Sequence, residues 1–138
     1  MNYLIDIRKP LIDAFIAVVG TTYEIEYENA GFEAPADDNY LSVYFVTNDT
    51  TAASLGDNGL NETDGFLQID LNWQPETGEY DQSVLIAQLA TAFKIGRAFV
   101  SNDVTTKIRS FRSVPGRKVN NYWRMSASII WYSFSNRN

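Results

Sequence analysis

The residues that most often carry catalysis or bind metal ions are missing from this chain of 138 residues, which contains no His and no Cys. Imidazole general bases, His-ligated zinc and thiol nucleophiles are therefore excluded. Gly56, Gly59 and Gly65 lie between two expected strands, whereas a phosphate-binding loop joins a strand to a helix. The sequence thus predicts no catalytic residue, no cofactor and no enzyme activity.

Carboxylates are the one abundant group that could do acid–base chemistry or bind a cation. Sixteen of the 17 acidic residues precede residue 94, but their spacing singles out no catalytic pair. Glu24, Glu26 and Glu28 alternate along an expected strand, where a charged and solvated sheet edge explains them. The acidic stretch 57–64 matches a calcium loop in composition only, because it lacks the regular ligand spacing and the closing Glu. We therefore predict no metal site.

The charge of the chain is unevenly divided along its length. Residues 1–93 hold 2 basic and 16 acidic side chains, and residues 94–138 hold 9 basic and 1 acidic. Three interpretations remain open. The two halves intermix in a folded sheet, or two opposed patches support head-to-tail contact between identical subunits, or a basic surface faces nucleic acid. The third interpretation rests on cations that lie near the aromatic residues Phe111, Tyr122 and Trp123.

The same charges supply the candidate binding residues. We predict an interface that combines acidic residues of one long loop with basic residues of the last third of the chain. These candidates are Asp57, Glu62, Asp64, Arg109, Arg112, Arg117, Lys118 and Arg124. Their role would be contact with another subunit or another protein.

Two helices are expected beside the elements that carry these residues. Apolar residues at helical spacing predict a helix over residues 7–19, with Asp6 as its N-cap and a glycine at its end. A second helix is predicted over residues 81–95, with Asp81 as its N-cap. Both helices have one apolar stripe, so each should pack one side against a core.

Alternation of apolar and polar residues predicts the strands. They are expected at residues 21–27, 40–46, 66–73, 97–100, 104–112 and 121–134. The last one is long, aromatic and free of Gly and Pro, which is typical of a strand in the middle of a sheet. We expect a long, mobile or functional loop over residues 48–64 and a basic turn at residues 115–118.

The order of these elements predicts an α+β fold. Its sheet would be mostly antiparallel, with about five to six strands and two helices packed on one face. The length fits one domain over residues 1–138. No apolar run approaches the length of a membrane span and no signal-peptide pattern opens the chain, so we expect no membrane contact.

Several stretches of the chain resemble the tail terminator proteins of long-tailed bacteriophages, also called tail-completion or minor tail proteins. The stretches that carry the resemblance are Ile25–Pro35, Tyr40–Val43, Ala53–Gly56, Gly65–Leu71 and the closing run Tyr122–Phe134. They cover essentially the whole chain, and their order supports the match more than any one of them does. They are structural motifs, so no ligand site is carried over from the family.

The resemblance implies a ring, usually a hexamer, on the end of the tail tube. Such a ring stops tube polymerisation and gives the head a surface for attachment, while the genome passes through the lumen without sequence-specific binding. The implied partners are further copies of the chain, the tail tube protein and a head-completion or neck protein. The implied location is the head-proximal end of the virion tail, after assembly in the host cytoplasm.

Two alternatives to this function stay open. One is another neck component, such as a head-closure or head–tail joining protein. The other is a single-strand nucleic-acid binding module. The composition of residues 49–64 further predicts that this segment is disordered in the free subunit and becomes ordered on the tube.

Overall fold

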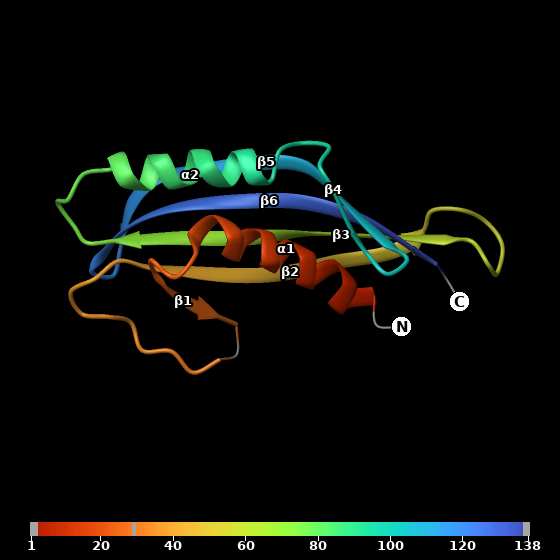
Figure 1. Cartoon of the computed structure of the whole chain (residues 1–138), viewed down its shortest axis with the longest axis horizontal. Coiled ribbons are helices and arrows are strands. Elements are labelled where there is room, and N and C mark those ends of the chain that lie inside the picture. The colour runs from red at the N-terminus through yellow and green to blue at the C-terminus, as the bar shows by residue number, and fades with distance from the viewer. Residues whose placement is uncertain (1–2, 29, 137–138) are drawn as a thin grey trace.

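The computed structural model describes residues 3–28 and 30–136 as two helices and six strands. Figure 1 shows both helices on the same face of the sheet. The helices are α1 (Tyr3–Val19) and α2 (Tyr80–Ala92), and the strands are β1 (Glu24–Tyr27), β2 (Tyr40–Ala52), β3 (Leu60–Trp73), β4 (Ala98–Ser101), β5 (Val104–Val119) and β6 (Tyr122–Asn136).

The six strands form one sheet in the order β1-β2-β3-β6-β5-β4. Only β1 and β2 pair in parallel; the other described pairs are antiparallel, and the sheet curls into a half-barrel. This confirms the predicted α+β class with its mostly antiparallel sheet. The prediction that the last strand is central is also confirmed, because β6 lies between β3 and β5.

The main core lies between the sheet and the two helices. Ile129 and Trp131 of β6 are fully buried there, as the apolar alternation of the last strand predicts. They pack with apolar side chains of both helices and of the neighbouring strands. At Gly65 of β3 the neighbours are so close that an added Cβ would lie 2.0 Å from the Val46 carbonyl oxygen and 2.6 Å from the Trp131 ring. A glycine is therefore required at this position for steric reasons.

The start of α1 differs from the prediction. The helix begins at Tyr3, so Asp6 lies inside it and is not its N-cap. The Asp6 carboxylate is buried, and its Oδ1 accepts hydrogen bonds from Ser101 Oγ at 3.1 Å and from Asn102 Nδ2 at 2.8 Å. The predicted cap is wrong because the two partners of Asp6 lie about a hundred positions away in the sequence, where no local pattern shows them. It joins α1 to the turn between β4 and β5.

The second helix is shorter than predicted and begins without the expected cap. Asp81 lies in the first turn of α2, after Glu79, and no side chain caps this end. Gln82 has the larger structural role, because it is fully buried and its Nε2 donates to the carbonyl oxygens of Leu71 and Trp123, each at 3.0 Å. One amide therefore joins α2 to two strands of the sheet.

The expected loop over residues 48–64 is wrong. The strands β2 and β3 continue into it as a long hairpin, and only residues 53–59 form the connection. Thr50 and Thr63 face each other across this extension, and their hydroxyl oxygens lie 2.9 Å apart. Threonine is favoured in strands, but a polar extension has no apolar alternation to reveal it in the sequence. Figure 1 shows the hairpin projecting beyond the helices, at the right.

The predicted basic turn at residues 115–118 is also wrong. These residues belong to β5, and the chain instead turns between Val119 and Tyr122. The pairing register with β6 shifts between Val114 and Arg117, so Pro115 and Gly116 occupy a bulge. A bulge accepts a Pro and a Gly that a regular strand would reject, which is why their presence suggested a turn.

Candidate assembly surface

The face of the sheet opposite the helices carries a polar network centred on Asp70 of β3. This carboxylate is 3% exposed. Its Oδ1 accepts hydrogen bonds from Ser126 Oγ at 2.7 Å and Gln68 Nε2 at 3.1 Å, and its Oδ2 lies 3.8 Å from Arg124 Nη1. A buried charge needs such partners, since desolvation alone would be costly.

The network reaches both neighbouring strands. Arg124 Nε donates to Asn72 Oδ1 at 2.7 Å, and Asn72 Nδ2 donates to Ser42 Oγ at 3.3 Å. The Ser42 hydroxyl in turn donates to Glu26 Oε1 at 3.0 Å. Sequence alternation placed Asn72 on the face away from the core, but it gave no sign that the side chain is buried. The covering groups come from distant parts of the chain, so this burial has no local signal.

Part of the cover comes from three aromatic rings. Phe32 packs on Tyr40 with ring centroids 5.2 Å apart, and Tyr40 meets Tyr122 edge to face at 5.0 Å. The Tyr122 hydroxyl donates to the Pro35 carbonyl oxygen, which holds the connection between β1 and β2 against this face. Burial, and then the nearby charge of Glu26, raise the pKa of the Tyr40 phenol. Phe32 thus anchors this connection on Tyr40.

The eight predicted interface residues do not form one cluster. Glu62 and Arg109 are brought together in an ion pair of 3.3 Å at the base of the hairpin, and the Arg109 guanidinium also lies over the ring of Tyr132. Asp64 lies near them and accepts a long hydrogen bond from the backbone N–H of Asp49. These three candidates therefore make contacts within the chain.

The remaining candidates are divided among four places. Arg117 and Arg124 belong to the polar network, because Arg117 Nη2 donates to Ser126 Oγ at 3.3 Å and Arg124 contacts Asp70. Arg112 is exposed on β5, and Lys118 lines a hollow of about 590 Å³ beside the start of α2. Asp57 is exposed at the hairpin tip. Fewer of these charges are available to a partner than the sequence suggested.

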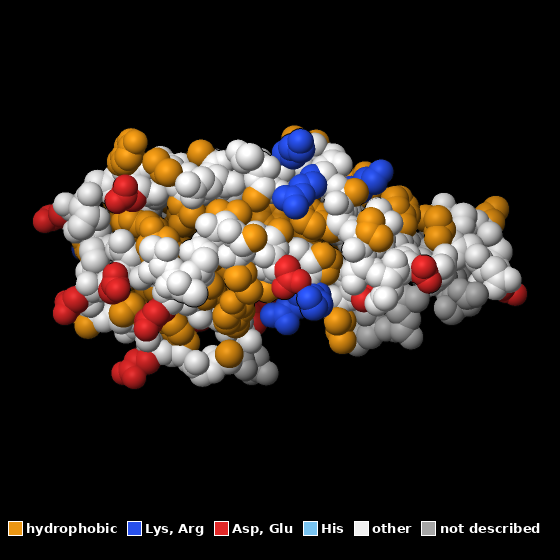
Figure 2. All heavy atoms as spheres, in the orientation of Figure 1, with side chains coloured by type: hydrophobic (Ala, Val, Ile, Leu, Met, Phe, Trp, Pro, Cys, Tyr) orange, Lys and Arg blue, Asp and Glu red, His pale blue; other side chains and the backbone are white. Residues whose placement is uncertain are grey.

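Charged groups remain partly separated on the folded surface. On the face in Figure 2, carboxylates lie mainly toward the two ends of the molecule, and the Lys and Arg side chains lie over its middle. Such a distribution leaves room for contacts between unlike regions of two copies.

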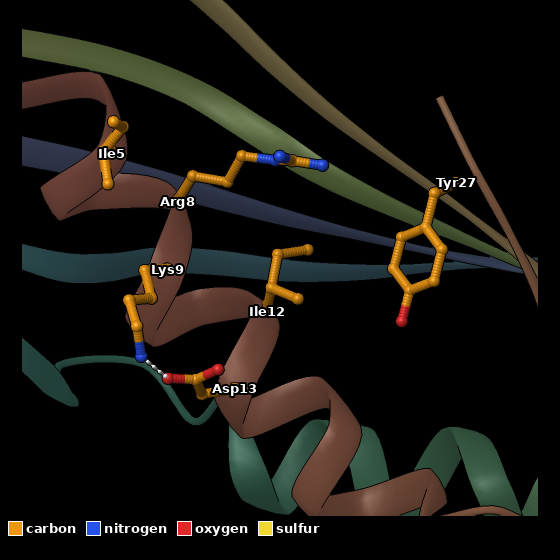
Figure 3. Close-up of a pocket in the computed structure, with 6 residues that line it drawn as sticks. All are labelled: Ile5, Arg8, Lys9, Ile12, Asp13 and Tyr27. Carbon is orange, nitrogen blue, oxygen red and sulfur yellow. Dashed lines mark hydrogen bonds and ion pairs between the residues drawn. The ribbon is translucent and has the colours of Figure 1, made fainter. Parts of the chain in front are cut away.

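Two apolar hollows adjoin α1 on the side of the sheet that carries the helices. The larger, of about 400 Å³, lies between α1 and Tyr27 of β1, and Figure 3 shows Ile12 and Tyr27 on its opposite sides. The smaller, of about 270 Å³, continues toward Phe45 of β2 and shares Ile5 and Arg8 with the first. Sequence reasoning assigned the apolar residues of this helix to the core and missed this groove.

Within residues 3–28 and 30–136, no three acidic side chains gather into a group that could hold a metal ion. No helix of this described part is long and apolar enough to cross a membrane.

The family profile of the phage tail terminator protein matches residues 6–131. The chain belongs to the phage tail terminator family. This membership confirms the resemblance read from the sequence and makes the chain a structural protein of a phage tail. A solved structure whose title states no function shares the fold with a TM-score of 0.68 at 15% identity, over 93% of this chain and 95% of that chain. No curated protein matches this member of the tail terminator family.

Proposed function

We propose that the chain forms a closed ring, with six copies, on the head-proximal end of the phage tail tube. The ring stops further tube polymerisation and gives the head or a neck protein its attachment surface. DNA passes through the lumen of the ring, which contacts it without reading its sequence. The observation that carries this proposal is the family match over residues 6–131.

Features of the fold support an assembly role. The polar network on the sheet is internally bonded, so Asp70 and Arg124 serve to hold β3 and β6 together. A projecting hairpin and an apolar groove are different surfaces of the same chain, and unlike surfaces can join copies head to tail into a ring.

The direct test is a tube-capping assay. Purified tail tube protein is allowed to polymerise, the chain is added at a fixed time, and tube lengths are measured by electron microscopy. A terminator stops growth, so tube length stays constant even when fresh tube protein is supplied. Continued elongation at saturating amounts of the chain would contradict the proposal.

The two alternative functions give different results in matched experiments. A head-closure or joining protein would bind finished heads and leave tube elongation unchanged. A nucleic-acid module would lose affinity for single-stranded DNA, with a weaker dependence on salt, when Arg117→Glu and Lys118→Glu are combined. As a control for folding, the double variant must unfold in the same urea range as the unmodified chain, because Arg117 also contacts Ser126.

A further inference from the structure

We propose that the hairpin tip of one copy docks into the groove beside α1 of a second copy. The tip is the connection 53–59 between β2 and β3, and the groove consists of the two adjoining hollows along α1. The inference rests on the proposed ring and names the contact that would close it.

The tip presents the side chain of Leu55 to solvent on a hydrogen-bonded turn. Leu55 is 97% exposed, the highest value among the exposed large apolar residues of the described chain. The turn is held by backbone hydrogen bonds, including Ala53 N–H to the Leu60 carbonyl at 2.8 Å and Gly59 N–H to the Gly56 carbonyl at 3.2 Å. An exposed leucine on a projecting and internally bonded turn is well placed to enter an apolar site on another molecule.

The groove has the chemistry that accepts such a side chain. Its walls include Ile5, which is 58% exposed, together with Ile12 and Phe45. The larger hollow, at about 400 Å³, exceeds the cavity of about 150 Å³ that holds a benzene molecule in a protein core. Figure 3 shows Arg8 extending from the helix at the rim of this hollow.

The edge of β2 beside the groove is also open to a partner. The short strand β1 covers β2 only from Tyr40 to Val43. The Glu28 carboxylate then accepts the Phe45 backbone N–H, and no described strand pairs with this side of β2 beyond that point. Unpaired strand edges accept extended segments of other chains. The groove therefore offers backbone groups as well as apolar surface.

Charge favours a second copy as the occupant. Asp57 lies two residues after Leu55 and is exposed at the tip. At the groove, Lys9 is paired with Asp13 at 2.7 Å, whereas Arg8 forms no ion pair within the described residues. An incoming tip would thus bring a carboxylate to an unneutralised guanidinium while its leucine enters the hollow.

The tip of a chain cannot fill the groove of that same chain. The Tyr3 hydroxyl lies 3.4 Å from Thr50 Oγ1, which fixes the start of α1 beside the base of the hairpin. Leu55 lies past the end of β2, in the connection 53–59 at the far end of the hairpin, which projects beyond the helices (Figure 1). The groove and the tip are therefore available to two different neighbours, so each copy can give a tip and receive one.

Disulfide trapping tests this contact, because the chain has no native cysteine. The variant with Leu55→Cys and Ile5→Cys should give a ladder of covalent oligomers after mild oxidation, ending at the size of the ring. Each single variant should stop at a dimer. Leu55→Cys with Ile95→Cys is the matched control, because Ile95 is also exposed but lies in the connection between α2 and β4 and lines neither hollow of the groove. An equal ladder from the control pair would overturn the inference.

Substitutions give a second readout that separates this inference from the proposed ring. Leu55→Asp should raise the concentration for half-assembly by at least about tenfold, because a buried leucine is replaced by a charge. Ile95→Asp should leave assembly unchanged. Asp57→Arg should weaken assembly, and the addition of Arg8→Asp should restore it.

The outcomes differ for the two claims. If the unmodified chain forms no oligomer, alone or on tubes, the proposed ring fails. If it assembles and Leu55→Asp assembles equally well, only the tip-in-groove contact is overturned. If Leu55→Asp keeps the ring and loses tube binding, the tip serves the tube protein and the second-copy assignment is wrong.

Discussion

Replacing Arg124 with methionine tests whether this candidate interface residue in fact holds the subunit fold together. Methionine keeps much of the side-chain volume and removes the guanidinium. In the unmodified chain, that guanidinium donates to Asn72 at 2.7 Å and lies 3.8 Å from the buried Asp70 carboxylate. Arg124→Met therefore leaves a buried acceptor without its donor and a buried charge without its counter-ion.

The size of the effect follows from what remains around Asp70. Removing one partner of a buried ion pair costs about 3–5 kcal/mol when the other charge is left uncompensated. Here Asp70 keeps its bonds from Ser126 and Gln68, and the Arg124 side chain is 21% exposed, so water replaces part of the loss. We expect the free energy of unfolding to fall by about 2–3 kcal/mol.

Urea unfolding followed by tryptophan fluorescence measures this change, at one protein concentration for all variants because assembly would add to apparent stability. Arg112→Met is the matched control, since Arg112 lies on the same face of the sheet, is exposed and has no ion pair among the described residues. The control should change stability by less than about 0.5 kcal/mol. A change that small for Arg124→Met would refute the structural role assigned to it.

Three further predictions concern other parts of the fold. Gly65→Ala should lower the free energy of unfolding by about 2 kcal/mol or more, measured by thermal unfolding. Gly31→Ala is the control and should be nearly neutral, because an added Cβ there meets no atom within 4 Å. Equal thermal midpoints for the two variants would contradict the close packing at Gly65. Asp6→Ala should cost about 1–2 kcal/mol and speed hydrogen exchange in the turn between β4 and β5, because the half-buried Ser101 hydroxyl and the exposed Asn102 amide both lose their acceptor. The pKa values of the Tyr23 and Tyr40 phenols are raised, so the folded state favours their protonated forms. Their contribution to the free energy of unfolding is therefore complete below pH 10, the ordinary phenol pKa, and declines as the pH rises above it. Tyr40→Phe should reduce this alkaline decline in a pH series of urea midpoints, and an unchanged slope would contradict the role of the Tyr40 phenol.

The sequence revealed those parts of the fold whose apolar residues alternate. The last strand showed its core face through Ala127, Ile129 and Trp131, and its central position followed from length and composition. Helix existence was equally clear, because each helix buries one apolar stripe. These patterns are local, so they can be recognised without knowing which segments pack against each other.

The parts that the sequence could not reveal depend on contacts between distant segments. The polar ends of β2 and β3 are strands because Thr50 meets Thr63, which no single stretch shows. Asp6 was read as a cap because its acceptor role depends on the turn between β4 and β5. The candidate interface residues were chosen for charge alone, and Arg124 shows why that is insufficient: a charged group on a strand can be used internally.

Native mass spectrometry shows directly whether identical subunits form a closed ring. The unmodified chain is measured over a range of protein concentration and salt, both alone and after release from the ends of tail tubes. A closed ring of six subunits should appear as one dominant hexamer that dissociates as ionic strength rises, since charge contributes to the contact. A monomer under every condition, including release from tubes, would contradict the ring.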